Sequence, residues 1–418
     1  MKKAMIITVG TGKTGEDIAG AICYSIDRER PDRILFLKTT ISSGTTMPYV
    51  LASPVLEGRD VVEAVIDDPS DVQAIATICE KHIRDLIDRG FSPENLVADF
   101  TSGTKAMSAG LTLAAINAGV GNLVYISGER DRDGRVIRGT EKAVSVRPNR
   151  MTAESLLDEA MRLFNAYQYD SCVKTLDRAK SLYQGPGFVK RCAVLQALGR
   201  GYGLWDRFDL RGAFSVLKGI DEKDLPEDWN VSRTVKLNKQ ALYREINEDF
   251  CEERAVDLLE NARRRGDAEK KYDDALARLY RLCEYIAQLQ LKREGLYRVR
   301  DGKVDTSDVA LEGLSGEIQE KYTRYLNERD GKVMLPLYQS FNLLADVGNK
   351  IGKAFLQDER LSRKLLQIRN NSILAHGFTP VSPKTYKDMM GCLEDLLRTS
   401  MENVDRLMSM VRFPIIGR

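Results

Sequence analysis

The stretch of this sequence with the clearest chemical potential is "QIRNNSILAHGFTP", from Gln367 to Pro380. It contains His376, one of only 2 histidines among 418 residues, seven positions after Arg369. In an α-helix, residues seven apart lie two turns apart on nearly the same face, about 10 Å apart along the axis. If a helix continues to Gly377 and Pro380, Arg369 and His376 point the same way.

These two side chains, with Asn370 beside them, could act on a phosphate. A guanidinium is the usual clamp for a phosphate, and an imidazole at the negative end of a helix is readily protonated and can act as an acid. The alternative is an arginine on a solvated face and a histidine that caps the helix. Because one such pair makes a small active site, the catalytic hypothesis also predicts a symmetric dimer that supplies a second pair.

Two glycine-rich turns near the N-terminus indicate anion binding. They lie in "TVGTGKTGED" (8–17) and "DFTSGTKAMSAG" (99–110), each after a predicted strand and before a predicted helix. Helix N-termini present free N–H groups, and hydroxyls and lysines add further anion-binding groups. The candidate ligand contacts are Gly10, Thr11, Gly12, Lys13, Thr39, Ser102, Gly103, Thr104 and Lys105.

Known nucleotide-binding patterns fit these turns poorly. The P-loop pattern requires a glycine where this chain has Ile7, and the loop is too short to wrap a triphosphate. Gly10, Gly12 and Gly15 match the dinucleotide pattern literally, but the second strand ends in "LKTTISSGTT" without a suitable acidic residue. Ser, Thr and Gly are also ordinary helix caps. The two turns together with the polar loop at 39–46 favour a phosphate-containing ligand.

The first 148 residues predict an α/β domain. Near-continuous apolar runs at 4–10, 33–39, 95–100 and 122–127 alternate with helical patterns, as in a mainly parallel, Rossmann-like sheet covered on both faces. Asp133-Gly134 suits the turn of a closing hairpin.

The remainder of the chain predicts an all-α half. A long helix is expected to begin near Arg263, and Asp301-Gly302 suits a small hairpin. The expected domains are 1–148, a helical linker at 149–247 and a helical bundle at 248–418.

Composition excludes several classes of protein. With 63 Lys and Arg against 61 Asp and Glu, the global charge gives no reason to propose nucleic-acid binding, so such a site must be local. The 7 cysteines are scattered without metal-ligand spacing, so neither a zinc site nor a disulfide framework is expected. The absence of a long apolar run or signal peptide predicts a cytoplasmic protein that does not span a membrane.

Here the sequence resembles a known family. "RNNSILAH" resembles the R-x4–6-H motif of HEPN ribonucleases, and "YDDALARLYRLCEYIAQ" (272–288) resembles the first long helix of a HEPN domain. The N-terminal turns "VGTGKTGE" and "DFTSGTKAMSAG" resemble those of a CARF domain, the sensor of cyclic oligoadenylates. In this order, the motifs resemble a CARF–HEPN ribonuclease of the ancillary effectors of type III CRISPR systems.

The resemblance implies a homodimer with two shared sites. Two CARF domains would form one pocket for a cyclic oligoadenylate, with four adenylates as the commonest ring in the family. Two HEPN domains would form one site that cleaves single-stranded RNA without a metal or cofactor, leaving a 2′,3′-cyclic phosphate. Arg369 would stabilise the pentacoordinate phosphate, His376 would take part in proton transfer or orient the 2′-OH, and Asn370 would support the geometry.

Three alternatives stay open at this level. The C-terminal helices could only dimerise or bind a partner, which would make the protein a non-catalytic sensor. The N-terminal domain could cleave its own ligand, as a ring nuclease, with hydroxyls such as those of Thr11 or Thr39. A small-molecule α/β enzyme is disfavoured because no histidine or paired carboxylates accompany the glycine-rich turns. The run "RRRGDAEKK" (263–271) could attract RNA, but a charge run is more often a solvated face, and it is interpreted as one.

Overall fold

The computed structural model describes residues 2–12, 14–129, 132, 137, 139–373 and 377–417. The chain divides into two compact units, one of residues 1–158 with 177–189 and one of residues 159–176 with 190–418. Three helices contribute residues to both units, namely α6 (Pro148–Asn165), α7 (Tyr169–Leu182) and α8 (Pro186–Asp206). The expected three-part division, with boundaries after residues 148 and 247, stays a prediction.

The first unit is built on a six-stranded sheet with the order β3-β2-β1-β4-β5-β6. Pairing is parallel from β3 to β5 along this order, and β6 pairs antiparallel with β5. The strands are β1 (Ala4–Val9), β2 (Arg33–Lys38), β3 (Asp60–Val65), β4 (Leu96–Asp99), β5 (Asn122–Ser127) and β6 (Lys142–Val146). This topology confirms the Rossmann-like, mainly parallel sheet predicted from the apolar runs.

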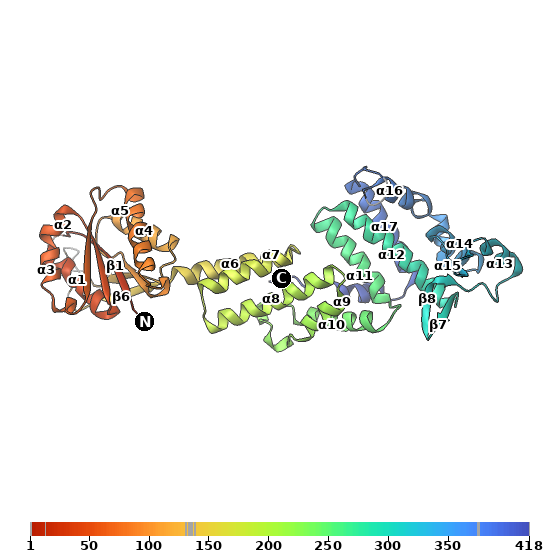
Figure 1. Ribbon diagram of the computed structural model, residues 1–418, viewed down its shortest axis with the longest axis horizontal. Coiled ribbons are helices and arrows are strands. Elements are labelled where there is room, and N and C mark those ends of the chain that lie inside the picture. Colours follow the sequence, from red (N-terminus) through yellow and green to blue (C-terminus); the bar gives the residue numbers. More distant parts are fainter. Residues whose placement is uncertain are drawn as a thin grey trace. The chain divides into compact units, whose positions relative to one another are not determined.

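Helices cover both faces of this sheet (Figure 1). Ala4 and Ile6 of β1 pack into one apolar cluster, and Met5 and Ile7 pack into another, because successive side chains of a strand point to opposite faces. Helices α4 and α5 complete the first cluster, and α1 and α3 complete the second. The helical elements of this part are α1 (Gly15–Glu29), α2 (Thr40–Thr45), α3 (Met47–Leu51), η1 (Pro54–Leu56), α4 (Val72–Asp88), η2 (Pro93–Asn95) and α5 (Lys105–Asn117).

At the sheet edges, the sequence missed one strand and predicted one strand pair. The edge strand β3 was not expected, because "DVVEAV" is partly exposed and lacks a continuous apolar run. The closing antiparallel pair is confirmed by the register of β5 with β6, whereas its predicted turn at Asp133-Gly134 lies outside the described residues.

The second unit is predominantly helical, as predicted. Helix α11 packs against α12, α17 and α18, and α12 also packs against α14, α16 and α17. From residue 210 onward the helical elements are α9 (Leu210–Lys218), η3 (Glu222–Asp224), η4 (Glu227–Trp229), α10 (Ser232–Asn247), α11 (Glu252–Arg263), η5 (Arg264–Ala268), α12 (Tyr272–Arg293), α13 (Gly316–Thr323), α14 (Leu337–Asp346), α15 (Lys350–Gln357), η6 (Arg360–Leu365), α16 (Leu366–Asn371), α17 (Pro383–Ser400) and α18 (Val404–Val411).

The expected long helix is confirmed as α12, but its predicted start near Arg263 is wrong. Helix α11 ends there, the π-helical turn η5 follows, and α12 begins only at Tyr272. Gly266 brings the turn against α17, since a methyl group in its place would lie 2.1 Å from the Tyr386 ring. Lys270 then takes a positive φ of 58°, which ends the turn.

Two small β-ribbons interrupt the helices of the second unit. The predicted hairpin is confirmed as β7 (Tyr297–Arg300) paired with β8 (Lys303–Val309). Asp301 and Gly302 both have positive φ, as a two-residue hairpin turn requires. The second ribbon joins β9 (Leu326–Asn327) and β10 (Lys332–Val333).

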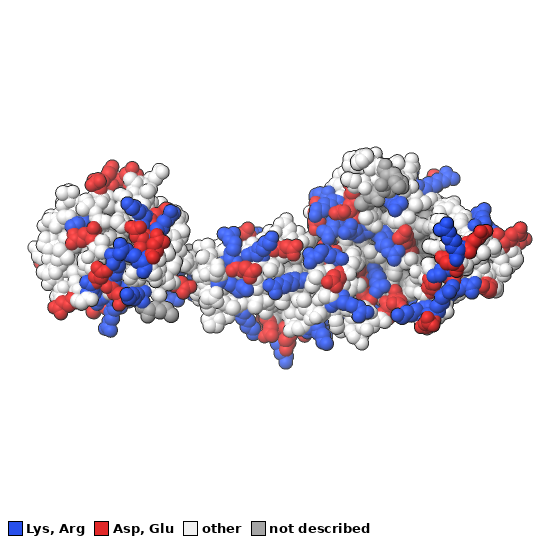
Figure 2. Space-filling view, in the orientation of Figure 1, with Lys and Arg blue, Asp and Glu red and all other residues white. Residues whose placement is uncertain are grey.

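Surface properties agree with the composition. Figure 2 shows basic and acidic side chains interspersed over the face in view. The 7 cysteines are free thiols, and 6 of them are buried. Among the described residues, no helix combines the length and the apolar character that crossing a membrane would demand.

Candidate functional site

The two glycine-rich turns lie against each other at the carboxyl edge of the sheet. The first turn follows β1 and the second follows β4, which are neighbouring parallel strands. A methyl group on Gly10 would lie 2.4 Å from the amide nitrogen of Gly103 and 2.8 Å from its Cα. Gly103 also has a φ of +101°, a conformation that favours glycine. The close approach of these two backbones therefore requires glycine at position 10, and the positive φ favours glycine at position 103.

Two buried hydroxyls hold the turns together. The Thr8 hydroxyl donates to the Ser102 carbonyl oxygen, and the Ser102 hydroxyl donates to the Thr8 carbonyl oxygen. Both side chains are buried. Because the Ser102 hydroxyl is bonded within the protein, a contact between Ser102 and a ligand would have to involve its backbone.

The segment predicted as a third polar loop, 39–46, instead forms the short helix α2, and it joins the same edge. Thr39 caps α2 by accepting from the Ser42 N–H, and Ser42 bonds back to the Thr39 backbone. The Thr46 hydroxyl donates to the Gly10 carbonyl oxygen at 2.8 Å. A methyl group on Gly15 would lie 1.9 Å from the Thr45 carbonyl oxygen, so α1 also starts in contact with this loop.

The remaining predicted contacts differ in exposure. Gly12, Thr104 and Lys105 are exposed, and Thr11 is half-buried. The Thr104 hydroxyl accepts from the Met107 N–H at 3.1 Å as the cap of α5, and donates to Pro69 at 2.6 Å. Helix capping therefore explains the presence of a hydroxyl at position 104, in agreement with the alternative that Ser, Thr and Gly in these turns are ordinary helix caps. Lys13 lies outside the described residues.

Sequence reasoning overlooked a carboxylate beneath the second turn. Asp99 ends β4, is 1% exposed, and accepts from the Thr101 N–H at 2.8 Å through Oδ1. Burial raises the pKa of Asp99, while hydrogen bonds from Ser25 and Thr101 act in the opposite direction. The position of an acidic residue at the end of a buried strand was the available signal. Since Asp99 is buried, its direct role is to shape the turn.

In the second unit, Arg369 lies on α16 over an aromatic ring. Its guanidinium carbon is 5.0 Å from the centroid of the Tyr280 ring on α12, a cation–π contact. An Arg369 N–H donates to the side-chain oxygen of Asn370 at 3.2 Å. Arg369 is half-buried and Asn370 is exposed. The structure thus brings these two predicted catalytic residues together, and His376 lies outside the described residues.

The expected two-turn helical spacing from Arg369 to Gly377 is wrong. Helix α16 ends at Asn371, and Ser372 has extended backbone angles. The Ser372 side chain is buried and donates to the Arg369 carbonyl oxygen at 2.8 Å, which caps the helix. Gly377 then donates its N–H to the Ser372 carbonyl oxygen at 3.2 Å. The chain therefore leaves the helix five residues before His376 and returns to its end at Gly377.

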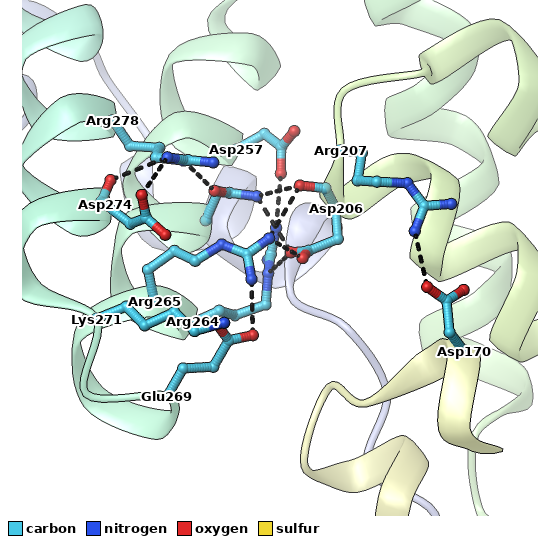
Figure 3. Close-up of polar contacts among 11 residues, drawn as sticks. Asp170, Asp206, Arg207, Asp257, Arg264, Arg265, Glu269, Lys271, Asp274 and Arg278 are labelled. Carbon is cyan, nitrogen blue, oxygen red and sulfur yellow. Dashed lines mark hydrogen bonds and ion pairs between the residues drawn. The ribbon is translucent and has the colours of Figure 1, made fainter. Parts of the chain in front are cut away.

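The structure also contradicts the interpretation of the arginines in the run at 263–271 as a solvated face. Arg264 is 5% exposed, and its Nε lies 2.9 Å from Oδ1 of Asp206 at the end of α8. Arg265 pairs with the other oxygen of the same carboxylate, so two arginines share one aspartate (Figure 3). The guanidinium of Arg264 also lies 3.7 Å from the centroid of the Phe413 ring. This network joins distant segments of the second unit around η5.

A metal centre finds no support in the described part of the chain. There, no group of three or more His, Cys, Asp or Glu side chains is placed to hold a metal ion.

Comparison with known proteins gives a family match for part of the second unit and a fold match for the chain. A family model described as the Csm6 HEPN domain matches residues 244–400, which include α16. No curated protein matches the chain.

Solved structures extend the comparison to the whole chain. The structure of Enterococcus italicus Csm6 bound to cyclic hexa-2′-fluoro-hexa-dAMP matches with a TM-score of 0.63 at 16% identity, over 98% of each chain. A type III CRISPR defence DNA nuclease activated by cyclic oligoadenylate matches 51% of this chain and 35% of its own at 15% identity. Its TM-score of 0.26 is too low to bear on the fold. The family model confirms the resemblance of the second unit to a HEPN domain, and the first structure shows that the chain shares its fold.

Proposed function

We propose that this chain is a cyclic-oligoadenylate-activated, metal-independent endoribonuclease for single-stranded RNA in type III CRISPR antiviral defence. The observation that carries the proposal is the Arg369–Asn370 pair, held over Tyr280 within the region that matches the Csm6 HEPN domain. A guanidinium fixed in this way suits the stabilisation of charge on a phosphate undergoing substitution.

The proposed reaction uses the RNA itself as the nucleophile. The 2′-OH loses its proton and attacks the adjacent phosphorus, and the 5′-oxygen of the next nucleotide leaves with a proton. The products are a 2′,3′-cyclic phosphate and a 5′-OH. Since no water must be activated, the mechanism needs no metal ion. Arg369 would neutralise the pentacoordinate phosphate, Asn370 would orient Arg369, and His376 would transfer a proton or orient the 2′-OH.

The ligand would bind at the carboxyl edge of the first unit's sheet. Support comes from the meeting of the two turns and the third loop there, with Gly12, Thr104 and Lys105 exposed. Open α/β sheets bind ligands at this edge, and helix N-termini favour phosphate. We propose cyclic tetra-adenylate as the activator. Because the Enterococcus italicus structure contains a six-membered analogue, cyclic hexa-adenylate is the other ligand to compare.

A homodimer is part of the proposal. A single Arg369 and His376 would give one cation and one acid–base group per phosphate, whereas two facing copies would supply two of each. The ligand pocket would likewise form from two copies, since a cyclic oligoadenylate is itself symmetric.

A fluorescent single-stranded RNA, incubated in EDTA with and without cyclic tetra- or hexa-adenylate, tests the proposal. We expect ligand-dependent cleavage that persists without metal and leaves a 2′,3′-cyclic phosphate. His376→Ala should abolish cleavage while ligand binding is retained. Ligand binding without cleavage at any concentration would instead identify a non-catalytic sensor. Loss of the intact ligand in the His376→Ala protein would identify a ring nuclease in the first unit.

A further inference from the structure

An exposed aromatic side chain lies on the segment that is bonded to the end of α16, the helix of Arg369 and Asn370. Phe378 is 91% exposed, the highest value among the large apolar side chains of the described chain. It follows Gly377 in the segment that returns to the end of α16. Covering a water-exposed aromatic ring with a flat partner lowers the free energy.

The backbone on both sides of Phe378 is bonded to α16 and its cap. Gly377 donates to the Ser372 carbonyl oxygen at 3.2 Å, and Thr379 donates to the Asn371 carbonyl oxygen at 2.9 Å. A methyl group on Gly377 would lie 2.0 Å from that Asn371 oxygen, so this contact requires glycine. The fold therefore presents Phe378 from a bonded segment that adjoins the helix carrying Arg369 and Asn370.

The surrounding sequence is locally cationic, although the whole chain is nearly neutral. Residues 361–387 contain 5 Lys and Arg and no Asp or Glu. Lys384 and Lys387, in the first turns of α17, are exposed. Cations interleaved with an exposed aromatic ring are the usual means of binding single-stranded nucleic acid.

The polar neighbours of Phe378 fit RNA better than a protein surface. Thr379, Ser382 and Lys384 are exposed, and Ile373 is the other exposed large apolar side chain of this segment. A protein interface would call for a wider apolar patch with few charges at its centre. A nucleobase needs only one aromatic face, with cations nearby for its phosphates.

We propose that Phe378 is a substrate-positioning residue that stacks on a nucleobase adjacent to the cleaved phosphodiester. The inference rests on the proposed ribonuclease function and names how that site holds its RNA. Stacking would fix the rotation of one nucleotide and so bring its neighbouring phosphate to Arg369. Removing one base–aromatic stack should weaken RNA binding roughly 5- to 150-fold.

The test combines protein variants with abasic RNA. A short RNA with one mapped cleavage site is prepared with single abasic nucleotides on either side of the cleaved bond. Binding is measured by fluorescence anisotropy in an Arg369→Ala background with Phe378, Phe378→Ala, Phe378→Leu or Phe378→Tyr. KM and kcat are measured for the same Phe378 variants in the otherwise wild-type, ligand-activated protein.

We expect Phe378→Tyr to bind RNA like wild type, and Phe378→Ala and Phe378→Leu to bind RNA more weakly. In the kinetic measurements, the latter two variants should change KM more than kcat. At one RNA position, the abasic substitution should weaken binding to wild type and have no further effect on Phe378→Ala. Independent, multiplicative losses would overturn the inference, as would equal binding by Leu and Tyr. Conversion of a dimer to a monomer by Phe378→Ala, without any abasic effect, would also overturn it and show that a second copy covers the ring.

These outcomes are separable from the proposed function. If the wild-type protein cleaves no RNA with either cyclic oligoadenylate, the proposed function fails. If it cleaves RNA and the Phe378 variants bind and cleave RNA like wild type, the stacking inference alone fails.

Discussion

Gly10 and Gly103 lie so close that a single added methyl group on Gly10 would approach the Gly103 nitrogen to 2.4 Å. The two residues are far apart in sequence and belong to the two turns that sequence patterns mark as anion-binding. Their contact joins the two turns at the sheet edge, and one of the two backbones must move if Gly10 gains a side chain.

Gly10→Ala should therefore damage the proposed ligand site. The clash is with backbone atoms and cannot be relieved by a rotamer change, so we expect a loss of about 1–3 kcal/mol in unfolding free energy and much weaker cyclic oligoadenylate binding. Thermal unfolding and ligand titration measure both. Gly20→Ala is the control, because a methyl group there meets nothing within 4 Å and alanine favours the helix. Equal stability and ligand binding in the two variants would refute the argument.

Arg369→Ala should lower the rate of RNA cleavage by roughly 10²- to 10³-fold, as expected for the loss of one group that stabilises transition-state charge. Arg369→Lys should recover little, since lysine lacks the planar fork of donors. Ligand binding and thermal stability should stay near wild type. Arg84→Ala is the control, because Arg84 is an exposed arginine of α4 that pairs with Glu80 and lies outside both proposed sites. A fully active Arg369→Ala protein would exclude the assigned role.

Asp206→Asn should strongly destabilise the second unit. The substitution leaves Arg264 and Arg265, both largely buried, without their shared carboxylate, and a broken buried pair costs about 3–5 kcal/mol. Asp170→Asn removes an exposed pair with Arg207 (3.7 Å) in the same region and should cost at most about 1 kcal/mol. Denaturant unfolding compares the two. Similar losses would mean that the network contributes no more than a surface ion pair.

Glu245 should make stability depend on pH. It is 1% exposed, and burial together with the Asp257 carboxylate raises the pKa of Glu245 well above the usual range. Between the usual and the raised pKa, the unfolded chain loses a proton that the folded chain keeps, so stability falls as pH rises through this interval.

Glu245→Gln should remove that loss, because a neutral amide has no proton to release. Melting temperatures measured from about pH 4 to pH 8 should then fall less steeply than those of wild type. The exposed Glu248→Gln should keep the wild-type slope. Identical slopes for Glu245→Gln and wild type would show that Glu245 is ionised in the folded protein.

The sequence was sufficient for the buried strands of the sheet and for the helical second half, whereas the partly exposed edge strand β3 was missed and the candidate site residues stay predictions. Buried parallel strands such as β1 are largely apolar, and glycine-rich turns are recognisable from their composition. Local sequence patterns therefore predict both. The pair Arg369 and Asn370 was found because its residue types and spacing match a known motif. The family model of the Csm6 HEPN domain matches residues 244–400, which include both residues, and their catalytic role stays a prediction.

Other features depended on contacts between residues far apart in the chain. Helix α16 ends at Asn371 because Ser372 buries its hydroxyl against the helix and because Gly377 and Thr379 return to bond its end. Arg264 is buried because Asp206 is available 58 residues away, which no local charge pattern can reveal. Local composition thus determined which elements form and which groups could act on phosphate. Only tertiary structure decided where the helix carrying Arg369 stops, which charges leave water and which turns meet.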